Sequence, residues 1–541
     1  MSRKKNSKKS LNQNTELRVL SIRINSDKIE KEIKNTLYTY RHFENILLLL
    51  IKENYEKYLQ GLDTENDFKH FTNKQTLRNA LLDYKSKNSV NSDYLKEKYK
   101  DNQLWQSLSE VARKIKQHNF GYIIDRVKAN YKTYFTNIKT YKENPGLFAG
   151  TPKPPKPKKL SKMIEYAIEL DKYTALSFAK LEKQNLIGIN LTNHMIYIYC
   201  NQEQIKKLTE IDKLYSARVV YDNGMLYLQI SYLKKINKQK QSQINKLAGI
   251  DIGVNNIAAI FIDDRTTPSL VIDGKPHKHY NSRFNRLVAK LNESKSQEVL
   301  EWKESKTGSK YPSRYTEKGK RIGRFISFLY AKRNRYFQDQ FHKIAKRIVE
   351  YLTLNGVSTL YISKNTAELK NNGECNLNKA VKQNFIQIPF IKLLKYIEYK
   401  AQEKGIQVYY VDEKYTSKAS CISDNVKSIQ DNPDLANAFK GKRVKRGLFL
   451  DTAINKIFNA DVNGAVNHIK VATGKCFIWL KDKLFKLANP IKIKSDYEFC
   501  KLIKNLQNSV SGKSISLMDI ESSYSNRMVA MLYSVRYKPT E

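Results

Sequence analysis

The sequence has few of the features that mark fibrous, secreted or membrane-spanning proteins. Its 541 residues include only 20 Gly and 12 Pro, and 40% are hydrophobic, which excludes a collagen-like or globally disordered chain. The five cysteines are scattered without a Cys-x-x-Cys pair, so we expect no disulfide framework. The longest aliphatic run, Ile46 to Ile51, is far shorter than the roughly 20 residues that a bilayer-spanning helix needs. No secretory hydrophobic segment follows Met1.

Acidic residues are scarce relative to basic ones. The chain has 97 Lys and Arg against 53 Asp and Glu, a formal net charge of +44. Because a compact domain with this charge repels itself, we expect a polyanionic partner. Nucleic acid is the first candidate for that partner, and an acidic membrane surface is the lesser one.

The chain is too long for a single core, and its N-terminal half divides by pattern. We expect the polar, basic residues 1–16 to form a disordered arm. Apolar residues recur at helical intervals over 27–145, whereas 17–26 and 146–240 contain alternating, strand-like patterns. We therefore predict a helical domain and a small β domain that the early strand joins.

The C-terminal half, residues 241–475, alternates strands with helices. An apolar run from Leu247 to Asp251 ends in a carboxylate, and further strands are predicted over Val357 to Ile362 and Ile406 to Val411. A helical pattern precedes each of the last two strands, which implies a mostly parallel sheet flanked by helices.

Three segments interrupt or follow this pattern. Residues 272–335 are a long insertion with basic residues at helical spacing. Residues 416–458 form a second, smaller insertion. Residues 476–541 lose the pattern, and we interpret them as a C-terminal tail that is partly ordered or binds RNA.

Three acidic residues occupy positions where a metal site can form. Asp251 ends a strand, Glu413 follows another, and Asp461 lies at the start of a helix. Taken singly, each has a structural explanation: an acid in a tight turn, a solvated acid at a strand end, and a helix cap. However, the carboxyl ends of parallel strands meet at one edge of a sheet, where ligands collect. Together the three carboxylates could hold two Mg²⁺ ions about 3.5–4 Å apart and cleave a phosphodiester.

Four motifs occur in a fixed order: GIDIGVNN from Gly249, YTSKAS from Tyr415, GKRVKRG from Gly441 and NADVNGAVN from Asn459. In that order they resemble the TnpB family, transposon-encoded RNA-guided nucleases related to compact type V CRISPR effectors. The resemblance implies a multidomain α+β protein. Its expected parts are an RNase H-like (RuvC) α/β nuclease domain over 241–475, a β-barrel wedge domain and a helical recognition lobe.

The resemblance also implies partners and cofactors. We expect a guide RNA that directs cleavage of target double-stranded DNA beside a short adjacent motif, with Mg²⁺, two ions in all, at the nuclease site. No membrane partner is expected, and the expected location is the cytoplasm of a prokaryote, in contact with the nucleoid through DNA. Whether the guide comes from a transposon end or a CRISPR array, and whether the protein is a monomer or a dimer, stays open.

One departure from the family concerns the middle acid. Relatives usually place a Glu at the end of the strand that here finishes at Ser363, and Ser cannot supply a carboxylate. Glu368 and Glu374 follow in a segment that we interpret as a loop. Many relatives have Pro where this chain has Glu413, on the neighbouring strand. We predict that Glu413 completes the triad with Asp251 and Asp461; the alternative is an RNA-guided DNA-binding regulator that does not cleave.

A second departure concerns zinc. Relatives often carry a four-cysteine ribbon between the Thr-Ser segment and the last Asp, but this chain has only Cys421 in that interval. Four thiolates cannot be assembled there, so we expect no zinc and interpret 416–458 as a degenerate ribbon-like insertion.

Basic side chains in three places are predicted to contact nucleic acid. A solvated linker or helix face explains each place nearly as well. The predicted contacts are Lys153, Lys156, Lys158 and Lys159 in a proline-lysine stretch, Arg321, Arg324, Lys332, Arg333 and Arg335 in the first insertion, and Lys442, Arg443, Lys445 and Arg446 in the second.

Overall fold

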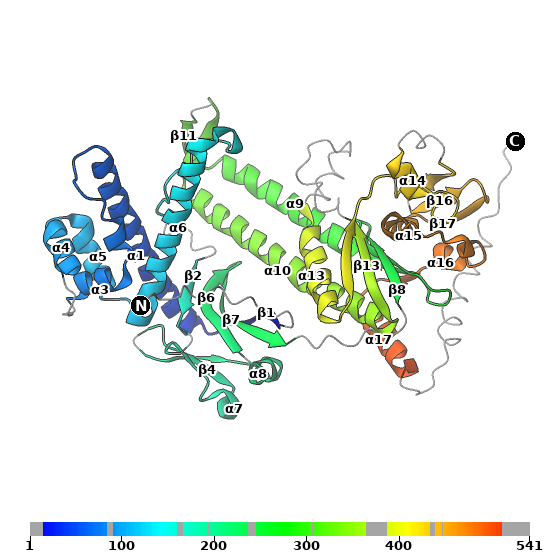
Figure 1. Ribbon diagram of the computed structural model, residues 1–541, viewed down its shortest axis with the longest axis horizontal. Coiled ribbons are helices and arrows are strands. Elements are labelled where there is room, and N and C mark those ends of the chain that lie inside the picture. The colour runs from blue at the N-terminus through cyan, green and yellow to red at the C-terminus, as the bar shows by residue number, and fades with distance from the viewer. Residues whose placement is uncertain are drawn as a thin grey trace, which may run out of the picture. The chain divides into compact units, whose positions relative to one another are not determined.

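The computed structural model describes residues 15–83, 90–158, 166–171, 173–192, 194–211, 213–235, 245–305, 308–363, 387–432, 439–445 and 447–510. The chain divides into two compact units, Met1–Ile236 and Asn237–Glu541 (Figure 1). The two are described separately. In the described parts of both, no helix combines the length and apolar character that crossing a membrane requires.

The helices of the first unit follow the predicted periodicity. They are α1 (Asp27–Leu59), α2 (Phe68–Phe71), α3 (Lys74–Leu82), α4 (Val90–Tyr99), α5 (Gln103–Ala112) and α6 (Gln117–Glu143). Leu37, Tyr40, Phe43 and Leu47 of α1 are completely buried, so the three- and four-residue spacing does mark the core face.

Two sheets complete this unit. The first has the order β1-β7-β6-β2, with β1 (Thr15–Arg23), β2 (Ala167–Leu170), β6 (Lys213–Asp222) and β7 (Met225–Lys235). Asn223 and Gly224 have positive φ, as the predicted hairpin turn requires, and the early strand β1 pairs with β7. The second sheet contains β3 (Leu176–Ser177), β4 (Leu186–Ile189) and β5 (Ile196–Tyr199), with α7 (Leu181–Gln184) and α8 (Gln202–Thr209) beside it in sequence. Closure into a barrel stays a prediction.

The second unit is built on a six-stranded mixed sheet of order β14-β13-β8-β9-β10-β18. Its strands are β8 (Lys246–Asp251), β9 (Asn256–Ile262), β10 (Leu270–Asp273), β13 (Val357–Ser363), β14 (Gln407–Val411) and β18 (Ile491–Ile493). The neighbours β8, β13 and β14 are parallel, so their carboxyl ends lie at one edge, which we call the carboxyl edge. The hairpins β8-β9 and β9-β10 are antiparallel.

Helices cover both faces of this sheet. On one face α10 (Glu317–Leu354), α13 (Phe390–Glu403) and α17 (Asp496–Val510) pack around Phe337, Phe341 and Leu393. On the other face α15 (Ala460–Thr473) packs through Val462, Val466 and other apolar residues.

The structure corrects the boundary that we predicted at residue 476. Strand β18 pairs in parallel with β10, and Ile493, Phe499 and Ile503 belong to the core of the sheet. Residues up to 510 are therefore part of the second unit's fold, not a tail. The short elements η3 (Ile478–Lys481) and α16 (Phe485–Ala488) precede β18.

The predicted helical insertion forms a projection that we call the arm. It consists of α9 (Lys275–Ser296), the hairpin β11 (Val299–Glu304) and β12 (Lys310–Tyr315), and the first half of α10 (Figure 1). A small separate core of Phe284, Val288 and Ile326 holds the two helices together. The sequence predicted the helices but not the hairpin between them.

The second insertion contains α14 (Val426–Asp431) and a three-stranded sheet, β15 (Gly441–Lys445), β16 (Leu448–Asp451) and β17 (Lys456–Asn459). The buried carboxylate of Asp451 joins its two ends. The hydroxyls of Ser420 and Ser423 donate to it at 2.5 and 2.7 Å, and the backbone amides of Ala453 and Ile454 donate to its other oxygen. Hydrogen bonds to Asp451 thus connect the two ends of this insertion.

Candidate active site

The sheet register brings the predicted acids to one edge. Ile362 pairs with Ile250, and Ser363 pairs with Val411, so Asp251, Ser363 and Val411 end three adjacent parallel strands at the same level. Because side chains alternate between faces, Asp251 lies on the face opposite the buried Ile250. That is the face covered by α15.

Two glycines let α15 approach this edge closely. A β-carbon on Gly249 of β8 would stand 1.9 Å from the carbonyl oxygen of Ala465, so only glycine fits. A β-carbon on Gly464 would stand 2.9 Å from Oδ2 of Asp251. The carboxylate of Asp251 therefore lies directly against the helix that carries Asp461.

The first turn of α15 positions Asp461. The Asn459 side chain caps the helix by accepting from the backbone amides of Asp461 and Val462 at 3.0 Å. The Asn256 amide donates to Oδ2 of Asp461 at 2.6 Å, and the Arg443 guanidinium lies 3.8 Å from Oδ1. Farther along the helix, Nδ1 of the buried His468 donates to the carbonyl of Ile250 at 3.0 Å, which ties α15 to the residue preceding Asp251.

The same helix holds the loop that carries Glu413. Asn467 donates to the carbonyls of Thr416 and Ala419, and Asn463 donates to Ala419 while accepting from the amide of Cys421. Thr416 in turn donates its amide and its hydroxyl to the carbonyl of Glu413. The motifs YTSKAS and NADVNGAVN are thus fitted to each other by hydrogen bonds.

Electrostatics connect the three acids. Burial and the nearby carboxylates of Asp461 and Glu413 raise the pKa of Asp251 well above its usual value, and the Arg443 guanidinium opposes that rise. The carboxylates of Asp461 and Glu413 and the Arg443 guanidinium thus all lie near enough to Asp251 to act on its charge. A cluster of negative charge with oxygen donors is the environment that a hard divalent cation stabilises.

A tight single-ion arrangement is not formed by these acids. Among the described residues, three acidic or imidazole ligand atoms all within 4.8 Å of one another occur at Glu65, Asp67 and His70. Asp67 there is already paired with Lys98 at 2.7 Å and accepts from the hydroxyl of Tyr99 at 2.7 Å. Asp251, Glu413 and Asp461 are spread more widely.

The basic residues that we predicted as contacts fall into different environments. Lys153, Lys156 and Lys158 are exposed, and two hydrogen bonds between Asn45 of α1 and the backbone of Lys158 anchor their segment. Arg321, Arg324, Lys332, Lys442 and Lys445 are exposed, and Arg335 is partly buried. Lys159 and Arg446, like Glu368 and Glu374, lie outside the described residues.

The prediction for Arg333 is wrong. Its guanidinium is buried, donates to Oδ1 of Asn281 at 2.9 and 2.7 Å and to the carbonyl of Gln387, and lies over the rings of Phe284 and Phe337. Arg333 joins the base of the arm to the chain before α13. Helical spacing alone could not distinguish this inward arginine from its exposed neighbours.

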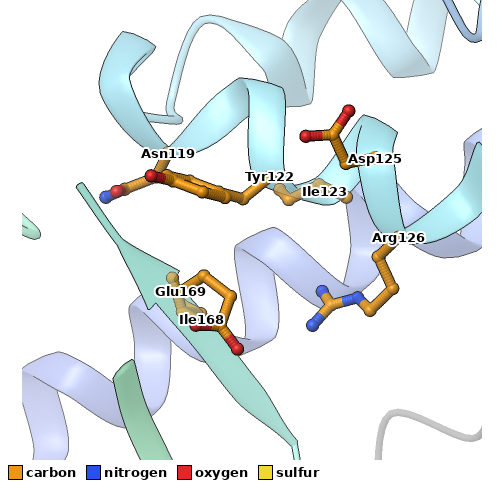
Figure 2. Close-up of a pocket in the computed structure, with 7 residues that line it drawn as sticks. All are labelled: Asn119, Tyr122, Ile123, Asp125, Arg126, Ile168 and Glu169. Atoms are coloured by element: carbon orange, nitrogen blue, oxygen red, sulfur yellow. The ribbon is translucent and has the colours of Figure 1, made fainter. Parts of the chain in front are cut away.

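Sequence reasoning missed Asn256, Gly464 and His468 as site residues. All three lie within or next to the quoted motifs, so their position in those motifs was the only signal available. The first unit also has a pocket of about 340 Å³ between α6 and β2 (Figure 2). Arg126, which lines the pocket, donates hydrogen bonds to Glu44, Tyr166 and the carbonyl of Ala167. These hydrogen bonds hold this side of the pocket together. None of the predicted site residues lines this pocket.

Comparison with known proteins agrees with the motifs. Residues 229–368 match the OrfB_IS605 family, described as a probable transposase, and residues 390–468 match the Cas12f1-like TNB domain. Together these regions contain Asp251, Glu413 and Asp461. The matches support placing the chain among TnpB proteins and compact type V CRISPR effectors.

Two curated relatives point the same way. The chain is 28% identical over 241 residues to the TnpB-like protein ORF457 of Acidianus two-tailed virus, covering 42% of each protein. It is 25% identical over 272 residues to the CRISPR-associated endodeoxyribonuclease Cas12f2 of a Micrarchaeota archaeon, covering 48% of this chain and 44% of the relative. The chain thus matches less than half the length of each.

Two solved structures also align: a Cas12f1–sgRNA–target DNA complex and a CRISPR-Cas12f ternary complex. Both are 14% identical and cover 83% of this chain and 98% of the aligned chain, with TM-scores of 0.27 and 0.29.

Proposed function

We propose that the protein is an RNA-guided, Mg²⁺-dependent DNA endonuclease with a single RuvC-like site. Two observations support this proposal: Asp251 and the strand before Glu413 end at the carboxyl edge, and the charges of Glu413 and Asp461 act on Asp251. The strand order β10-β9-β8-β13-β14, with the first three strands antiparallel and the last ones parallel, supports an RNase H-like assignment. A wedge role for the β domain and a recognition role for the helical domain belong to the same proposal.

The donor set fits magnesium. Three carboxylates offer hard oxygen ligands, and burial together with the charges of Asp461 and Glu413 raises the pKa of Asp251. The three acids do not form a group with all ligand atoms within 4.8 Å of one another, so two ions rather than one are proposed. Asp251, Glu413 and Asp461 would hold the ions, which would supply activation of a water for attack on a phosphodiester and stabilisation of the leaving oxygen.

The chain's own residues orient this site. Asn256 fixes the rotamer of Asp461, and Gly464 admits the carboxylate of Asp251 against α15. Arg443 lies where a cationic donor meets a phosphate that approaches the acids, and its weak 3.8 Å contact with Asp461 leaves donors for that phosphate. Arg443 thereby combines the predicted nucleic-acid contact with a place in the site.

Guide RNA and target DNA are the proposed partners. Base pairing reads sequence in such enzymes, and the protein mainly binds backbone, which explains the charge of +44 better than one local patch would. The alternative is an RNA-guided DNA binder without cleavage, which the serine at position 363 favours.

The test is cleavage by the purified protein with the RNA that co-purifies with it. A plasmid matching the sequenced guide should be linearised with Mg²⁺ and left intact with a chelator, with Asp251→Ala and with Glu413→Gln. Each variant should bind the plasmid as the unmodified protein does. Tight RNA-dependent binding without cleavage by the unmodified protein would establish the regulator instead.

A further inference from the structure

The arm presents an exposed aromatic stripe on α10. Phe325 and Phe328 are 47% and 52% exposed, although phenylalanine usually lies in a core. Their rings are nearly parallel, with 18° between planes and 6.2 Å between centroids. The pair is separate from the small core of the arm, whose α10 residue is Ile326.

Cations flank the two rings on the same helix face. Arg321, Phe325, Phe328 and Lys332 follow one another at intervals of three and four residues, and Arg324 is one turn before Phe328. All five side chains are exposed. Between residues 275 and 335 the sequence contains seventeen Lys and Arg against five Glu.

A second copy of the chain is a poor occupant for this stripe. At a two-fold interface the same patch faces itself. An antiparallel contact would place Arg321 opposite Lys332, and a parallel one would place each cation opposite its equivalent. A nucleic-acid strand instead pairs its phosphates with the cations at both ends of the stripe. Its bases supply flat rings that stack on the phenylalanines.

The position of the stripe favours DNA. The turn at Asn355-Gly356 joins the end of α10 to the start of β13. The helix is therefore antiparallel to β13, and its N-terminal half extends past the carboxyl edge of the sheet. The base of the arm contacts that edge, because Lys278 of α9 donates to Asn255 at 3.2 Å and Asn256 holds Asp461. At about 1.5 Å per residue, Phe328 and Phe325 lie about 14 and 18 Å farther out than the core residue Phe337.

We propose that Phe325 and Phe328 stack on unpaired bases of the target DNA strand that enters or leaves the active site, while Arg321, Arg324 and Lys332 bind its phosphates. This rests on the proposed nuclease function, because the strand that must reach the acids is the polymer beside the carboxyl edge. Paired bases present only their edges, so phenyl rings select unpaired DNA.

The test measures binding of a fluorescent single-stranded DNA to the full chain with its co-purified RNA, in the Asp251→Ala background so that no strand is cut. The double variant F325A/F328A should weaken this affinity by about ten- to a hundredfold, because each stacked base contributes about tenfold or more. Melting temperature and RNA content should not change, since both side chains are exposed.

A matched variant separates stacking from apolar contact. F325L/F328L keeps apolar side chains and should bind as weakly as the alanine pair, whereas F325W/F328W should bind at least as tightly as the unmodified residues. Unchanged affinity in F325A/F328A, or full binding by F325L/F328L, would overturn the proposal. So would a dimer that F325A/F328A converts to a monomer, because a second copy would then occupy the stripe. Failure of plasmid cleavage by the unmodified protein is a separate result that concerns the nuclease proposal.

Discussion

Gly464 lies against Asp251 so closely that an added β-carbon would stand 2.9 Å from the carboxylate oxygen Oδ2 and 3.2 Å from its carbon. A methyl group there must displace Asp251 or push α15 from the sheet. The charges of Asp461 and Glu413 also act on Asp251, so a displacement of Asp251 changes the electrostatics of the site.

We therefore expect Gly464→Ala to reduce plasmid cleavage by at least about a hundredfold, since small misplacements at an active site have effects of that size. RNA binding and DNA binding should be retained. Gly146→Ala is the matched control, because no atom lies within 4 Å of a β-carbon added there. Cleavage by Gly464→Ala at the unmodified rate would show that Asp251 does not need its present position.

Ser363 offers a test of whether Glu413 replaces the acid that relatives carry at the end of this strand. It ends β13 between Asp251 on β8 and Val411 on β14, on the face that α15 covers. A carboxylate at this position would point toward the same cations as Glu413. In the inactive Glu413→Gln background, Ser363→Glu is expected to restore part of the cleavage, measured as the rate of plasmid linearisation.

The matched control for that rescue is Ser363→Gln in the same background, which has the length of Glu without its charge. Recovery in the glutamate variant and none in the glutamine variant supports a metal-binding carboxylate. Full activity of Glu413→Gln alone would exclude Glu413 from the triad.

The strand ends, the helix faces and the order of elements followed from the sequence, because hydrophobic spacing reports burial directly. Leu37 and Tyr40 are buried as their spacing indicated, and the Asn223-Gly224 turn has the backbone that its composition predicts. The placement of Asp251 and Val411 at one edge of the sheet also followed, because parallel strands share an edge.

Other features depended on tertiary partners that one sequence does not display. Strand β18 is three residues long and joins the sheet only by pairing with β10, so its local pattern was too short to detect. Arg333 has the helical spacing of its exposed neighbours and differs in facing Asn281. Gly464 is required by the approach of Asp251 from a strand more than 200 residues away.

Asp451 is expected to stabilise the second insertion without a metal. Its carboxylate is completely buried and accepts from two serine hydroxyls and two backbone amides. Asp451→Ala leaves these donors unpaired and should lower the free energy of unfolding by about 3 kcal/mol or more, measured by urea denaturation. The exposed Asp431→Ala should change it by less than about 0.5 kcal/mol.

A chelator provides the second half of that test. If hydrogen bonds alone close the insertion, a zinc chelator leaves the melting temperature of the unmodified protein in place. A chelator-dependent loss of stability would show that a metal contributes, against our expectation.

Substitution of Arg333 should lower the stability of the protein, whereas substitution of Arg321 should weaken DNA binding. Arg333→Ala removes buried hydrogen bonds to Asn281 and to the carbonyl of Gln387, so we expect about 3 kcal/mol of destabilisation. Arg321→Ala should leave unfolding unchanged and instead weaken DNA binding, with a shallower dependence of affinity on salt concentration. Salt titrations and urea denaturation of both variants distinguish the structural arginine from the exposed one.

Two buried histidines and one partly buried one predict that the second unit loses stability as the pH falls. Burial lowers the pKa values of His277, His342 and His468 to about 4 each, from the ordinary value of 6.5. The unfolded chain therefore binds more protons than the folded one between these values. Their contribution to stability is fully present above pH 6.5 and decreases as the pH falls toward 4.

Each such histidine contributes a slope of about 1.4 kcal/mol per pH unit within that window. His468→Gln removes one of the three and should flatten the dependence of unfolding free energy on pH between 6 and 4.5 by about that amount. The exposed His279→Gln is the matched control and should leave the slope as it is. An unaltered slope in His468→Gln would mean that His468 is protonated in the folded protein, and its hydrogen bond to Ile250 would then carry a buried charge beside Asp251.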